Sequence, residues 1–158
     1  MSSDLFNKGL GKFDRWMDVI VNSLSSARRR VLFRTIARDL RKANQKRISK
    51  QINPDGDAWE ARKFDNGSGQ VRKKIKMMIG LRSTRRLKIT AGPDGATIGF
   101  SGRNAKIAAV HHFGGMDLVD PDSTTKIRYP VRQLLGVTKE DQTLIRDRVF
   151  GHIETAAS

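Results

Sequence analysis

The sequence "SSARRRVLFRTIARDLRKANQKRISKQ", residues 25–51, decides the fold because it predicts one long amphipathic helix. Apolar residues recur along it at three- and four-residue steps, as one face of a helix requires. That stripe consists of Val31, Leu32, Ile36, Leu40, Ala43 and Ile48. Ser25 or Ser26 is a suitable N-cap, and the abundant Ala, Leu, Arg, Lys and Gln favour helix. We therefore expect a helix that ends near residue 51.

The same helix is strongly basic, with ten Lys or Arg residues against one acid, Asp39, between positions 28 and 50. The ten candidate partner-binding residues are Arg28, Arg29, Arg30, Arg34, Arg38, Arg41, Lys42, Lys46, Arg47 and Lys50. Either nucleic-acid phosphates or an acidic protein surface would suit them. Residues 28–30 spread over most of the helix circumference, and aromatic residues for base stacking are few. Nucleic-acid binding therefore remains as the alternative hypothesis.

The whole chain has 158 residues and a formal net charge of +15. This length predicts a single domain over residues 1–158, and the charge again predicts acidic partners. Cysteine is absent, which excludes disulfides, thiolate metal sites and cysteine nucleophiles. No apolar run approaches the roughly 20 residues of a membrane span, and the N-terminus lacks the apolar core of a signal peptide. We expect a soluble chain that is not exported by that route.

Turn residues and apolar periodicity divide the rest of the chain into short elements. The other predicted helices are residues 4–24, a possible docking helix, and residues 70–82, 102–113 and 138–153. Residues 85–101 predict a β-hairpin, because apolar residues alternate with polar ones on both sides of a Gly-Pro-Asp-Gly turn. Between these lie a loop pinned by Trp59 (53–69), a polar loop (116–126), an extended segment (126–136) and a loose tail (154–158). The pattern predicts a mixed fold in which helices predominate.

The stretch "KIAAVHHFGG", residues 106–115, holds two of the three histidines of the chain. His111 and His112 are adjacent and point about 100° apart on a helix, whereas a helical metal pair has its ligands four residues apart. Patterns typical of a nucleophilic serine elbow, a phosphate-binding loop or a calcium loop are missing. We therefore expect no catalytic residue, metal or cofactor. Gly114 or Gly115 is expected to end the helix in a left-handed conformation, with Phe113 anchoring the turn.

Three stretches together resemble the phage virion morphogenesis, or tail completion, family. They are "RRRVLFRTIARDLRKANQKRISKQINPDGDAWEARK" (28–63), "LRSTRRLKITAGPDGATIGFSGRNAKIAAVHHFG" (81–114) and "RYPVRQLLGVTKED" (128–141). We match His112 to the family histidine because it directly precedes Phe113 and Gly114. The residues that carry the family motifs are Trp59, His112, Phe113, Gly114, Tyr129, Pro130, Leu135 and Gly136. The resemblance covers about residues 25–153. In pattern the sequence is similar to the S-type proteins of contractile-tailed phages.

The resemblance implies an α+β fold, with a small antiparallel sheet and a β-hairpin flanked by several helices. It implies a structural role, not catalysis. Such a protein would form a ring, usually of six copies, at the head-proximal end of the tail, end tube and sheath growth and prepare the tail for head joining. Its partners would be copies of itself, tube and sheath proteins, and neck connectors. DNA would pass through without specific binding, so we expect most of the basic helix to face acidic protein. The chain would be assembled in the host cytoplasm and reside in the tail-neck region of the virion.

Overall fold

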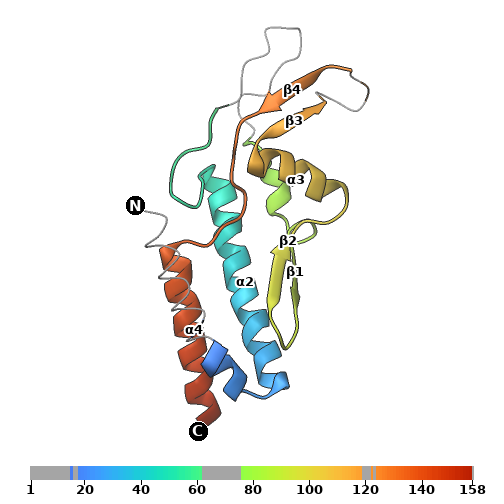
Figure 1. Cartoon of the computed structure of the whole chain (residues 1–158). Helices are drawn as coiled ribbons and strands as arrows, with labels where there is room; N and C mark the ends of the chain where they lie inside the picture. The colour runs from blue at the N-terminus through green and yellow to red at the C-terminus, as the bar shows by residue number, and fades with distance from the viewer. Residues whose placement is uncertain (1–14, 16–17, 62–75, 119–121, 123, 158) are drawn as a thin grey trace.

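The computed structural model describes residues 15, 18–61, 76–118, 122 and 124–157. Its elements are α2 (Ser26–Lys50), the 3-10 helix η1 (Ile79–Arg82), β1 (Lys88–Ala91), β2 (Ala96–Gly99), α3 (Arg103–Phe113), β3 (Gly115–Leu118), β4 (Lys126–Tyr129) and α4 (Lys139–Ala157). The α+β class is confirmed. In Figure 1, α4 runs beside α2, the β1–β2 hairpin lies on the other side of α2, and α3 with β3–β4 lies beyond the end of α2.

The long helix α2 confirms the prediction from residues 25–51. The side chain of Ser25 caps its start by accepting a hydrogen bond from the backbone N–H of Arg28, at 3.4 Å. Gln51 ends it in the left-handed region, with φ of 61°. The inward stripe repeats every four residues and consists of Leu32, Ile36, Leu40, Asn44 and Ile48. Because four residues turn a helix by about 40° more than one revolution, this stripe winds slowly around the axis.

The winding of α2 gives it two separate apolar clusters. Near its start, Leu32 and Ile36 pack with Val149 of α4. Near its end, Ile48 packs with Trp59, Leu81, Ala108 and Leu134. Trp59 is only 6% exposed, which confirms that it pins the loop after α2 on the core. One helix therefore joins both halves of the molecule.

The two hairpins are separate two-stranded sheets, each antiparallel. The β1–β2 hairpin is the predicted one, with Ile89 opposite Ile98 and the turn closed by a 2.9 Å hydrogen bond from Gly92 N to the carbonyl of Gly95. The β3–β4 hairpin was not expected: residues 116–118 pair with residues 126–128 and are not loop. The residues between Leu118 and Lys126 contain no glycine, so the turn signal that marked the first hairpin is missing here. The described residues form two two-stranded sheets where one small sheet was expected.

The helix predicted over residues 70–82 is wrong for its described part. Residues 70–75 lie outside the described residues, and Met78 has a φ of 53°, which interrupts any α-helix before the short turn η1. The side chain of Gln51 accounts for this: it accepts a hydrogen bond from Met77 N (2.7 Å) and donates one to the Met77 carbonyl (2.9 Å). Tertiary contacts with α2 therefore override the local helical pattern.

The two ends of the described chain also differ from expectation. Of the predicted helix 4–24, residues 4–14 and 16–17 lie outside the described residues, while residues 15 and 18–23 are helical. Ile20, Val21 and Leu24 pack against the cluster around Leu32. The loose tail predicted for residues 154–158 is wrong as far as Ala157, because α4 continues that far. Thr155 supports it with a 2.8 Å hydrogen bond to the Gly151 carbonyl, and alanine favours helix.

Candidate functional site

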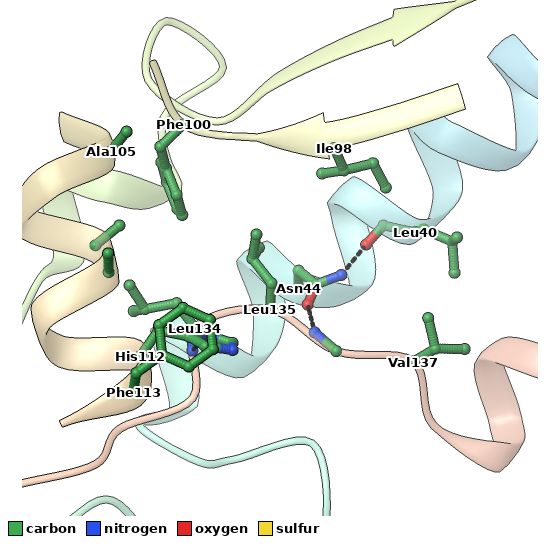
Figure 2. A pocket seen from close by; sticks show the side chains of 13 residues that line it. Leu40, Asn44, Ile98, Phe100, Ala105, His112, Phe113, Leu134, Leu135 and Val137 are labelled. Carbon is green, nitrogen blue, oxygen red and sulfur yellow. Dashed lines mark hydrogen bonds between the residues drawn. The ribbon is translucent and has the colours of Figure 1, made fainter. Parts of the chain in front are cut away.

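The connecting segment, residues 130–138, runs from β4 to α4 and brings the three sequence motifs together. Extended backbone outside a sheet must find other hydrogen-bond partners, and here side chains from the other two motifs accept from its N–H groups. The acceptors are Asn53 (from Gln133, 2.9 Å), His112 (from Leu134, 3.1 Å) and Asn44 (from Gly136, 2.9 Å). In Figure 2 a dashed line joins the Asn44 side chain to a backbone nitrogen of the connecting segment, and this bond is the one donated by Gly136 N. The polar residues of these motifs therefore build the fold.

Arg47 binds within the chain, which corrects its assignment as a partner-binding residue. Its guanidinium forms an ion pair with Asp141 at 2.9 Å and donates to the carbonyl of Gly136 at 2.9 Å. The Arg47 and Asp141 side chains are only 12% and 5% exposed. Asp141 also accepts from Thr138 N (3.0 Å), and its own N–H donates to Thr138 Oγ1 (3.1 Å). This reciprocal capping box confirms Thr138 as the N-cap of α4.

Two motif glycines lie where a side chain has no room. Gly114 has a φ of 68°, and an added Cβ would come within 2.8 Å of Val131 Cγ2. Its ψ of 127° shows that it leaves α3 in a positive-φ conformation other than the predicted left-handed cap. At Gly136 a Cβ would meet the ring of Pro54, including Pro54 Cβ at 2.8 Å. Pro54 follows α2, so this contact again joins the first motif to the third.

The two histidines have different roles at the end of α3. Burial lowers the pKa of His112, and its Nδ1 accepts the hydrogen bond from Leu134 N, so the neutral ring carries its proton on Nε2. The carbonyl of His111 accepts from Arg132 N at 2.7 Å. Its ring lies edge-on to the Tyr129 ring, with centroids 4.9 Å apart. Both histidines therefore hold β4 and the connecting segment against α3.

The remaining motif residues sit at the two ends of the connecting segment. The hydroxyl of Tyr129 donates to the carbonyl of Leu118 at 3.3 Å, across the β3–β4 hairpin. Pro130 follows the last residue of β4 and is half-buried. Leu135 packs against the cluster that contains Trp59. These residues fix the path of the chain from the hairpin to α4.

Phe113 does not anchor the turn in the core, which corrects the prediction. Its side chain is 74% exposed, because Gly114 turns the chain away directly after it. Phe113 instead lies at the rim of an apolar groove of about 450 Å³, bounded by α2, β2, α3 and the connecting segment. Figure 2 shows this groove, with Phe100, Leu135 and Val137 around it. The turn at Gly114 therefore leaves a large aromatic side chain of the motif at the surface, beside this groove.

Six of the ten candidate cations form a line along α2, which we call the basic stripe. It consists of Arg30, Arg34, Arg38, Lys42, Lys46 and Lys50, all of them exposed. The basic stripe and the inward stripe both repeat every four residues, and they are offset by two residues. The basic stripe therefore lies about 200° around the helix axis from the inward stripe over its whole length of about 30 Å. The expectation that the charge surrounds the helix is therefore wrong for these six residues. Asp39, the only acid of α2, pairs with Arg148 of α4 at 2.7 Å.

The other four cations have different surroundings. Arg28 is exposed, while Arg29 and Arg41 are half-buried. Arg29 donates to the side chain of Asn22 at 3.4 Å. Together with the inward-facing Arg47, this leaves the basic stripe as the continuous basic surface of α2.

Three structurally central residues were missed by sequence reasoning: Asn44, Asn53 and Arg132. Arg132 is 4% exposed and donates from Nε to the carbonyl of Glu60 at 2.9 Å. The signal for Asn44 was available, because it occupies an apolar position of the four-residue stripe. A polar residue at a buried helical position must have a partner, although its identity does not follow from the stripe.

The described residues contain no group of three or more His, Asp or Glu side chains placed to hold a metal ion. Within the same residues, every helix lacks the combination of length and apolar character that crossing a membrane requires.

Comparison with known proteins agrees with the resemblance that the motifs carry. Residues 9–154 match the model of the phage virion morphogenesis family. Tail completion protein S of Escherichia phage P2 is 36% identical over 145 residues, which cover 90% of this chain and 96% of that protein. None of the solved structures matches the chain significantly. The match spans all three motifs that meet at the connecting segment, and the chain belongs to the phage virion morphogenesis family.

Proposed function

We propose that this chain is a tail completion subunit that forms a ring, of six copies, at the head-proximal end of a contractile phage tail. The ring ends the growth of tube and sheath and prepares the tail for joining to the neck and head. The chain acts as a structural protein in the tail-neck region of the virion, after assembly in the host cytoplasm, and not as an enzyme. The single observation that carries the proposal is the 36% identity to tail completion protein S over 96% of that protein.

The surface of the chain supports an assembly role. Several large apolar side chains are exposed, among them Phe113 (74%), Met116 (60%) and Val131 (51%). Soluble monomers rarely expose contiguous apolar patches of large area. Directional contacts between copies that close after one full turn give a ring. The motif polar groups that a catalytic site would need, such as Asn44 and His112, are already bonded to backbone.

The proposal is tested by removing the chain from the phage that encodes it. Electron micrographs should then show tails that lack a terminal ring and heads that stay unjoined. Purified chain added to these tails should bind at one end and restore joining. Native mass spectrometry of the tail-bound protein should give six copies per tail. Normal virions in its absence, or binding along the whole tail, would contradict the proposal.

We also propose that the basic stripe contacts an acidic surface of a tube or sheath subunit. The stripe carries six exposed cations over about five and a half helical turns, whereas strong phosphate binding in a ring channel would hinder the passage of DNA. Complementary charge speeds association and sets orientation. The contact should therefore weaken as salt rises, because exposed charges are screened.

A matched pair of variants separates the stripe from the net charge. One variant replaces Arg34, Arg38 and Lys42 of the stripe with Gln. The other makes the same change at three exposed cations on other elements, Lys88, Lys106 and Lys139. Only the first should lose binding to tails made without the chain, and the salt dependence should become shallower. An equal loss of tail binding in both variants would contradict a specific role of the basic stripe. Loss of duplex DNA binding with tail binding intact would instead support the alternative, a basic nucleic-acid-binding module.

A further inference from the structure

The apolar groove beside Phe113 is unsuited to a small polar ligand. It has about 450 Å³ of space, and most of its wall comes from apolar side chains such as Leu40, Phe100 and Leu135. Its two polar wall residues are already engaged, since Asn44 is bonded to the Leu40 carbonyl (2.8 Å) and to Gly136 N, and His112 to Leu134 N. Small-molecule sites combine an apolar wall with a few convergent polar groups. The groove therefore fits an apolar protein surface better.

The groove continues along α2 into a second hollow of about 470 Å³, with Leu40 and Ile98 lining both. Two exposed carboxylates, Asp18 and Asp94, lie at this far end. Arg29 also lines it, with its guanidinium directed to Asn22. A matching partner therefore presents apolar side chains toward Phe113 and positive charge toward Asp18 and Asp94.

The β3–β4 ribbon of the same chain has this combination. Met116 (60% exposed) lies opposite Arg128, and Leu118 (37% exposed) lies opposite Lys126. Opposite residues of an antiparallel pair share one face of the ribbon, so an apolar row runs beside a basic row. An isolated two-stranded hairpin is marginally stable in water. In Figure 1 the ribbon projects past α3, away from α4. This face is therefore available to a second molecule.

We propose that the groove receives the β3–β4 ribbon of a second copy of this chain. Met116 and Leu118 enter the apolar part, Phe113 covers them from the rim, and Lys126 and Arg128 face Asp18 and Asp94. The contact joins two different surfaces, so it is directional and propagates from copy to copy. This contact would be the subunit interface of the ring, so the inference rests on that proposed function.

The absence of cysteine allows this contact to be tested by placing single thiols in the full-length chain. Met116→Cys labels the ribbon, and Val137→Cys labels the groove, where Val137 is 50% exposed. The two variants are mixed, supplied to tails made without the chain, treated with a short bismaleimide and separated by denaturing electrophoresis. The same mixtures are examined as concentrated protein without tails. Thr155→Cys, exposed on α4, replaces Val137→Cys in the control.

The expected result is a cross-linked dimer from the Met116→Cys and Val137→Cys mixture, and at least tenfold less from either variant alone or from the control. The double variant Met116→Cys/Val137→Cys should then give a ladder that ends at the ring size. Cross-linking of only like with like, equal cross-linking of the control, or none under either condition, overturns the ribbon-in-groove contact. A ladder that stops at the dimer supports the contact but contradicts the proposed ring, which separates the two failures.

Discussion

At the scale of single residues, Gly114 shows how one backbone angle sets the surface of the protein. With φ of 68° and Val131 Cγ2 2.8 Å from an added Cβ, Gly114→Ala should lower the free energy of unfolding by about 1–3 kcal/mol. Gly115→Ala is the matched control, because nothing lies within 4 Å of its added Cβ. Urea unfolding followed by circular dichroism measures both. Equal effects of the two substitutions would show that the positive φ of Gly114 is unimportant.

His112 makes stability depend on pH. Because burial lowers its pKa in the folded chain, the unfolded chain takes up the proton first as pH falls through the ordinary value of about 6.5. The unfolded state then binds more protons, so the free energy of unfolding should decrease from about pH 6.5 downward until the folded pKa is passed. Protonation also removes the Nδ1 acceptor of Leu134 N.

Urea unfolding between pH 5 and pH 8 measures this effect. His112→Gln offers a side-chain oxygen as acceptor without a titrating group in this range, so its free energy of unfolding should vary less with pH. If His112→Gln retains the full decrease at low pH, His112 is not its source.

At the scale of elements, the start of α4 depends on Arg47 of α2. Arg47→Met leaves the Asp141 carboxylate buried without its cation, although the hydrogen bond from Thr138 N remains. Breaking a buried ion pair from one side typically costs about 3 kcal/mol, so a loss of this size is expected. Arg146→Met is the control: its pair with Asp147 spans 3.7 Å, with side chains 52% and 67% exposed. Such surface pairs contribute about 0–1 kcal/mol.

Thermal and urea unfolding of the two variants compares these pairs directly. If Arg47→Met costs no more than Arg146→Met, the capping box of Thr138 and Asp141 holds α4 without Arg47, and the link between the first and third motifs is not important for stability.

The elements also show which parts of the fold could be predicted from the sequence. The helix α2 and the β1–β2 hairpin follow from local periodicity and turn residues, and Thr138 follows from capping chemistry. The break at Met78 depends on Gln51, a partner far along the chain, so no local pattern indicates it. The strands of the β3–β4 ribbon pair locally, but the residues between them lack the Gly-Pro-Asp-Gly turn that marks the first hairpin. The ten cations were recognised from the sequence. Which of them point outward, such as Lys46, and which point inward, such as Arg47, depends on their angular position relative to the buried stripe of α2.

At the scale of the whole molecule, residues of the same motifs divide between the interior and the surface. Asn44, Arg47, Asn53 and His112 bond to the connecting segment, and Trp59 lies in the core, whereas Phe113 points outward. Sequence alone assigned all the motif residues to structure, because exposure of an aromatic side chain is decided by the turn at Gly114. Surface and core residues of one motif are therefore separable by substitution.

Phe113→Ser tests this separation. Because the side chain is 74% exposed, the free energy of unfolding should change by less than about 0.5 kcal/mol. Binding to tails and ring formation should nevertheless fall, since aromatic residues are enriched among the interface side chains whose removal costs about 2 kcal/mol or more, on the order of thirtyfold in affinity.

Two control substitutions, one at the surface and one in the core, are compared with Phe113→Ser. Phe150→Ser, at a 46% exposed position on α4, makes the same chemical change away from the groove. It should lower the free energy of unfolding more than Phe113→Ser, because more of its side chain is buried, yet leave assembly intact. Leu134→Ala, at a position only 1% exposed, should cost about 2–5 kcal/mol of stability and lose assembly only through unfolding. Urea unfolding and negative-stain images of complemented tails measure the two properties. If Phe113→Ser forms rings as well as the wild type does, the groove rim is not a subunit contact and another exposed apolar surface must join the copies.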